Sequence, residues 1–162
     1  MGVHKSGHEA AGKQCRSMAY EASEHLMRFQ PPRVVGLIWA APYSLLGMTI
    51  GVAGLCSGGT VRSCDGVLEF SGGLTQRFVQ RLPGGEFALA ITLGHTVLGQ
   101  TEAALDIAHE HELVHVRQYE RWGPFFGPAY LGASLVIWLR GGDPYRENPF
   151  EREAYDAVPE NG

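Results

Sequence analysis

A long apolar stretch in the first third of the chain constrains the fold most, because its side chains have to be removed from water. No charged residue occurs between Val34 and Cys56, and about 20 apolar residues suffice for a helix that crosses a bilayer. We therefore predict a polar N-terminal leader over residues 1–32 and one transmembrane helix over 33–57 in the inner membrane. A buried core segment broken at Pro42 is the alternative interpretation.

Glycine spacing and flanking charges extend this prediction. Gly47 and Gly51 are four residues apart, a spacing that lets two membrane helices pack closely, so we expect a homo-oligomer through this helix. Five positively charged residues precede the apolar stretch, and three follow it before residue 100. Because positive residues are enriched on the cytoplasmic side, this imbalance favours an outside location for the rest of the chain.

A pair of histidines one helical turn apart is the strongest chemical signal in the sequence. His111 and His115 are separated by four residues, so both imidazoles project from the same face of a helix. With Glu112 they form the HExxH pattern of zinc metallopeptidases. In that pattern the histidines hold Zn²⁺ and the glutamate takes a proton from a water molecule bound to the ion.

The neighbouring residues place this motif inside a long helix. Thr101 offers a start signal and Gly123 a stop signal, so we predict a helix over about 103–122. His109 falls on a different face of that helix and is a poor candidate ligand. Gln118 lies one turn beyond the second histidine, where it is expected to contact the imidazole.

A third ligand is expected further along the chain, because a catalytic zinc has three protein ligands and one open position. Asn148 and Pro149 are typical of a helix start. On such a helix Glu151 and Glu153 project about 200° apart, so only one of them faces the ion. The spacing alone does not choose between the two.

The motif and the downstream segment together resemble a known group of enzymes. HExxH followed by a Glu-x-x-Ala-Asp type segment is similar to the gluzincins, especially the membrane-embedded stress proteases and prenyl-protein proteases. Phe-Glu-Arg-Glu-Ala-Tyr at 150–155 matches this segment, which implies that Glu151 is the third ligand. Tyr155 stands where the group has an aspartate. The stretches 111–118 and 148–154 also resemble a family of small uncharacterised bacterial membrane proteins.

The fold class expected from these features is α+β. Turn signals and partial alternation predict strands over 60–70, 77–82 and 87–98. The resemblance implies a small gluzincin-like zinc domain over 58–162, with a short antiparallel sheet, the HExxH helix and a ligand helix. It also makes 90–93 the strand beside the zinc helix, whose edge pairs with an extended peptide substrate.

A second apolar segment, 123–139, lies between the histidines and Glu151. A complete crossing of the bilayer would leave the ligands on opposite sides. If Glu151 is a ligand, this segment has to be re-entrant, interfacial or packed on the zinc helix. We expect a membrane-surface helix that begins near Pro124 or Pro128 and braces the site.

Net charge and cysteine content bear on two further questions, whether the protein binds nucleic acid and whether it forms a disulfide. The net charge is −4 and the basic residues form no dense patch, which argues against nucleic acid as a partner. The cysteines are Cys15, Cys56 and Cys64. Free thiols are the favoured interpretation, and a disulfide between Cys56 and Cys64 is the alternative.

The function predicted from the sequence is a membrane-tethered, zinc-dependent peptidase with Glu112 as the general base. Its partners would be a peptide or protein substrate and membrane lipid. A further donor is needed for the tetrahedral oxyanion, and four side chains are candidates: Tyr130, Tyr145, Tyr155 and His95. A non-catalytic zinc protein and a metal-free membrane scaffold on the same fold are the alternatives.

Overall fold

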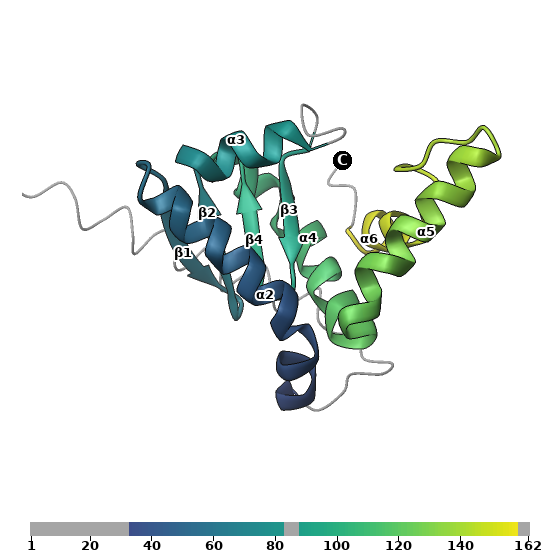
Figure 1. Ribbon diagram of the computed structural model, residues 1–162, viewed down its shortest axis with the longest axis horizontal. Coiled ribbons are helices and arrows are strands. Elements are labelled where there is room, and N and C mark those ends of the chain that lie inside the picture. The colour runs from purple at the N-terminus through teal and green to yellow at the C-terminus, as the bar shows by residue number, and fades with distance from the viewer. Residues whose placement is uncertain (1–32, 83–87, 159–162) are drawn as a thin grey trace, which may run out of the picture.

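The computed structural model describes residues 33–82 and 88–158, so the predicted leader over 1–32 lies outside the described residues. Within them the protein has an α+β fold with a small sheet between helices (Figure 1). The elements follow one another as α2 (Arg33–Leu55), β1 (Thr60–Cys64), β2 (Val67–Ser71), α3 (Gly73–Arg81), β3 (Ala90–Leu93), β4 (Thr96–Gly99), α4 (Glu102–Trp122), the 3-10 turn η1 (Gly123–Phe125), α5 (Phe126–Leu139) and α6 (Pro149–Ala157).

The sheet is mixed, which corrects the predicted antiparallel sheet. Its strand order is β1-β2-β4-β3. The β1–β2 and β3–β4 pairs are antiparallel hairpins, but β2 pairs with β4 in parallel. The parallel pairing arises because α3 carries the chain from the end of β2 to the second hairpin, which then places β4 rather than β3 beside β2. The strand β3 is left at the edge.

Two of the predicted strands are hairpins broken by turns. The expected strand over 60–70 turns at Asp65 and Gly66, which both have positive φ, as a two-residue hairpin loop requires. The expected strand over 87–98 turns at Gly94, whose φ is 63°. The predicted strand over 77–82 is wrong, because this segment belongs to α3. Its buried residues Thr75 and Val79 are four residues apart, which is the periodicity of a helix face.

The sheet separates two apolar layers. Phe70, Leu98 and Val79 form the layer under α2 and α3. Val67, Val97 and other small apolar residues form the layer under α4. Neighbouring residues of one strand enter opposite layers, as the two-residue period of a strand dictates. The helix α4 is thereby fixed against β3 and β4.

The helix α2 is long and apolar enough to cross a membrane over Val34–Leu55, judged by length and composition. Its glycine face, however, packs on the protein's own sheet. A Cβ atom on Gly47 would meet Thr96, and one on Gly51 would meet the ring of Phe70. The spacing that predicted a homo-oligomer therefore serves close packing within the chain. The opposite face of α2 carries exposed apolar side chains.

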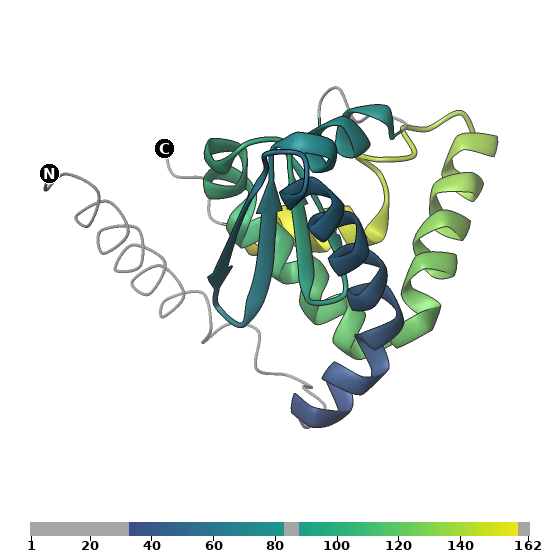
Figure 2. The same ribbon diagram turned by 60° about the vertical axis from the view of Figure 1, so that its left-hand side comes forward.

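The second apolar segment forms η1 and α5, and α5 extends away from the sheet (Figure 2). Phe126 and Tyr130 pack near Phe150 of α6, whereas the outer part of α5 exposes Leu131, Leu135 and Trp138. The chain then returns, and Asn148 donates to the backbone oxygen of Tyr130 at 3.1 Å. The segment that follows α5 therefore brings α6 back against α4.

Candidate metal centre

The helix α4 carries the HExxH motif through its middle, as predicted. The Thr101 hydroxyl caps its start by accepting from the backbone N–H of Ala104 at 3.1 Å. Gly123, with φ of 57°, ends it. The uninterrupted helix places His111 and His115 one turn apart on one face, and their rings lie edge to face with centroids 4.8 Å apart.

Three side chains converge at this face. Nε2 of His111 lies 3.2 Å from Oε2 of Glu151, and Nε2 of His115 lies 3.4 Å from the other oxygen of that carboxylate. The two Nε2 atoms are 3.1 Å apart. Each side chain thus offers one ligand atom to a common centre, and these atoms all lie within 4.8 Å of one another.

The structure distinguishes the two glutamates of α6. Asn148 accepts from the backbone N–H of Phe150 and caps the helix, with Pro149 in its first turn. This start turns Glu151 inward, where it is buried. Glu153 turns toward Arg121 and Gln118 on α4. Of the two carboxylates, Glu151 is the one brought to the histidines.

Gln118 connects the two helices of the site. Its amide nitrogen donates to the backbone oxygen of Phe150 at 3.0 Å and to Glu153 at 2.9 Å. Its amide oxygen is therefore the atom that accepts from Nδ1 of His115, at 2.8 Å. This bond places a proton on Nδ1 and turns Nε2 toward the cluster. The predicted contact between Gln118 and His115 is confirmed.

His115 and Glu151 shift each other's pKa in opposite directions. Burial lowers the pKa of His115, but its contacts with Glu151 and the negative charge of Glu112 outweigh burial and raise that pKa to about 9. Burial raises the pKa of Glu151, but its contacts with both histidines outweigh burial and hold that pKa well below its usual range. In the absence of metal, the cluster is an ion pair around a buried carboxylate.

Tyr130 brings α5 into the site. Its hydroxyl donates to Oε1 of Glu151 at 2.7 Å. Burial, followed by the charge of Glu151, raises the pKa of Tyr130 far above its ordinary value, so this hydroxyl keeps its proton. Of the four oxyanion candidates, Tyr130 is thus the one that bonds to the carboxylate of the cluster.

The other oxyanion candidates lie differently. The imidazole of His95 is paired with Glu120 at 3.0 Å. Tyr155 places its ring against His111, with centroids 4.7 Å apart, and its hydroxyl donates to Tyr145. Tyr155 therefore contacts the first histidine through its ring, at the place where the gluzincin pattern has an aspartate.

Glu112 is buried beside the cluster and is held from the sheet. Thr92, on the edge strand β3, donates its hydroxyl hydrogen to Oε2 of Glu112 at 2.7 Å. The strand Ala90–Leu93 has the bounds predicted for the strand beside the zinc helix and contacts α4. Thr92 is not among the residues predicted for the site. Its signal, a threonine at a buried position of an alternating strand, is too common to be specific.

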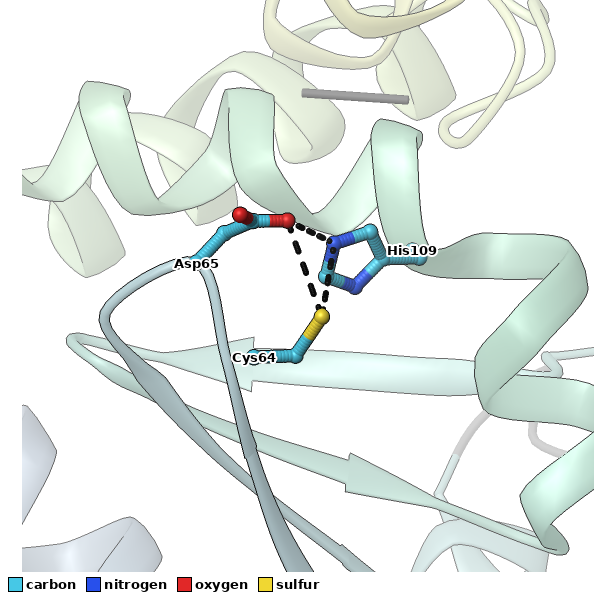
Figure 3. A group of neighbouring side chains, drawn as sticks. All are labelled: Cys64, Asp65 and His109. Atoms are coloured by element: carbon cyan, nitrogen blue, oxygen red, sulfur yellow. Dashed lines mark hydrogen bonds and ion pairs between the residues drawn. The ribbon is translucent and has the colours of Figure 1, made fainter. Parts of the chain in front are cut away.

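A second group of ligand-type side chains lies at the start of α4, formed by Cys64, Asp65 and His109 (Figure 3). His109 lies 2.9 Å from Asp65 through Nε2 and 2.6 Å from the buried Glu69 through Nδ1. Cys64 is disulfide-bonded, so its sulfur is not a thiolate that could bind metal. We interpret this group as a polar contact that holds the β1–β2 hairpin on α4.

The prediction of free thiols holds for one of the two described cysteines and is wrong for the other. Cys56 is free and exposed, as expected. Cys64 is disulfide-bonded, so the interpretation of free thiols is wrong for this residue. Because Cys56 is free, the alternative pairing of these two cysteines is not formed either.

Comparisons with protein-family models, with curated proteins and with solved structures found no match to this chain.

Proposed function

We propose that the chain is a zinc-dependent peptidase attached to a membrane through the apolar faces of α2 and α5. The observation that carries the proposal is the convergence of His111, His115 and Glu151, with Glu112 buried beside them. Two imidazoles and one carboxylate form a ligand set that catalytic zinc uses in hydrolases.

The observed distances fit this ion. Ligand atoms that surround zinc tetrahedrally at 2.0–2.1 Å lie about 3.4 Å from one another. The separations between the Nε2 atoms and the Glu151 oxygens are 3.2 and 3.4 Å, and the two Nε2 atoms are 3.1 Å apart. The proton that Gln118 holds on Nδ1 of His115 leaves Nε2 as the atom for the metal.

The roles of the residues follow from these positions. A zinc ion on His111, His115 and Glu151 supplies a Lewis acid that polarises the scissile carbonyl and lowers the pKa of water. Glu112 accepts the proton of the attacking water and passes it to the leaving amine. Tyr130 holds Glu151 through its hydroxyl. The open edge of β3 is where an extended peptide would pair with the backbone.

Membrane attachment is supported by exposed apolar surface. Apolar side chains of α2 and of the outer half of α5 are exposed, and the sequences of both helices lack acidic and basic residues after Arg33. Surfaces of this kind mark a membrane or protein interaction site. Membrane lipid is the proposed partner here, together with a peptide or protein substrate.

The experiment is a comparison of Glu112→Gln with the wild type. Glu112→Gln is expected to keep zinc and to lose hydrolysis of unfolded casein, by roughly 100-fold or more, because the general base is absent. The matched control is Glu110→Gln, which makes the same change on the same helix. Hydrolysis that survives in Glu112→Gln would contradict the mechanism. Zinc without hydrolysis in the wild type would identify a non-catalytic zinc protein.

A further inference from the structure

The edge strand β3 places the hydroxyl of Thr92 in the layer under α4. Thr92 is buried and pairs in register with Val97, which belongs to the apolar cluster of this layer. A buried hydroxyl without a partner costs stability. The hydroxyl of Thr92 has a partner, because it donates a hydrogen bond to Oε2 of Glu112 at 2.7 Å. The backbone oxygen of Glu112 lies further away, at 3.3 Å.

This contact constrains the orientation of the carboxylate. A glutamate side chain has three rotatable bonds, and a buried carboxylate without a fixed partner can point to either side of its helix. The bond from β3 occupies one oxygen and leaves the other free to accept a proton. Because β3 is fixed in the sheet by β4 and packed on α4, the donor itself is held in place.

We propose that Thr92 is a positioning residue that holds the Glu112 carboxylate in the orientation required for proton transfer. This inference rests on the proposed peptidase function. The strand that would receive the substrate also holds the general base, so one element aligns both. Precise placement of reacting groups makes a large contribution to enzymatic rates.

The test compares Thr92→Val with Thr92→Ser. Valine keeps the shape but removes the hydroxyl, whereas serine restores it. We expect Thr92→Val to lower kcat for casein-derived peptides by about tenfold or more, with zinc content and KM unchanged. Thr92→Ser should restore most of the rate. A kcat for Thr92→Val within twofold of the wild type, or an equal loss in Thr92→Ser, would overturn the proposal.

A second measurement is independent of activity. The unfolding equilibrium of the metal-free protein is measured in urea for Thr92→Val, Glu112→Ala and the double variant. If the hydroxyl holds the carboxylate, the two effects are not additive, and the coupling is about tenfold in the unfolding constant. Additive effects would show that the contact does not hold Glu112. Coupling without any hydrolysis by the wild type would instead locate the failure in the proposed function.

Discussion

At the scale of single residues, burial and neighbouring carboxylates shift the pKa of His115 in opposite directions, and the net shift makes the stability of the metal-free protein depend on pH. Its pKa is raised from 6.5 to about 9, chiefly because contacts with Glu151 and the charge of Glu112 outweigh burial. A raised histidine pKa stabilises the fold fully below pH 6.5, and this stabilisation is lost as the pH rises toward 9. The lowered pKa of Glu151 stabilises the fold above its ordinary value of 4.5 and is lost in acid.

We therefore predict that the metal-free protein loses stability between pH 6.5 and 9, on the order of 3 kcal/mol. The measurement is urea unfolding in the presence of a chelator across this range. Glu151→Gln is the control, and it should flatten the dependence because the carboxylate charge is gone. A wild-type stability that stays constant or rises over this range would contradict the ion pair described for the site.

Residue spacing predicted much of the site. The four-residue interval predicted that His111 and His115 share a helix face. The position of Gln118 one turn beyond His115 predicted their contact. Helix geometry alone did not decide whether Glu151 or Glu153 contacts the histidines. Only the resemblance to the gluzincins pointed to Glu151. Thr92 and the Tyr130–Glu151 bond depend on how β3 and α5 pack on α4 and α6. Contacts between elements distant in sequence have no local signal, so the sequence did not predict them.

At the scale of elements, α2 depends on glycine for its close approach to the sheet. A Cβ atom on Gly51 would clash with the buried ring of Phe70, whereas one on Gly132 of α5 would meet nothing within 4 Å. We predict that Gly51→Ala destabilises the fold by about 1–3 kcal/mol through overpacking. Gly132→Ala should be neutral or slightly stabilising, because alanine favours helix. Thermal unfolding compares them, and equal effects would contradict this packing.

The β1–β2 hairpin is attached to α4 through a buried carboxylate. Glu69 accepts from Arg62 and from His109, and its side chain is fully buried. We predict that Glu69→Ala costs about 3 kcal/mol. Arg62 and His109 both lose their buried partner and keep only the more exposed carboxylates of Asp106 and Asp65. Asp106→Ala removes the exposed partner of Arg62 and should cost less than about 1 kcal/mol. Urea unfolding measures both, and similar losses would refute the role given to Glu69.

Elements were predicted where the pattern was local and complete. The starts of α4 and α6 followed from their caps at Thr101 and Asn148, and the end of α4 followed from Gly123. The prediction of a strand over 77–82 is wrong because the segment that forms α3 is short and has few apolar residues, which leaves its period ambiguous. The mixed sheet could not be predicted, because strand order depends on the crossover through α3 rather than on any strand sequence.

At the scale of the whole molecule, the exposed apolar faces of α2 and α5 predict membrane association. Leu131 and Leu135 are exposed on α5, and changing both to aspartate places charges on this face. We predict that the double variant binds phospholipid vesicles at least about tenfold more weakly, because each charge opposes insertion. Circular dichroism should show an unchanged fold. Ser63→Asp on the exposed side of β1 is the control, and an equal loss there would contradict a specific membrane face.

The measurement that tests the central claim most directly is the zinc content of the purified wild type beside Glu151→Ala and Glu153→Ala. The described geometry predicts about one zinc per chain in the wild type and in Glu153→Ala, because one metal site accounts for both histidines. Zinc should be lost or much weakened in Glu151→Ala. Absence of zinc from the wild type, or equal zinc in Glu151→Ala, would contradict the three-ligand site formed by His111, His115 and Glu151.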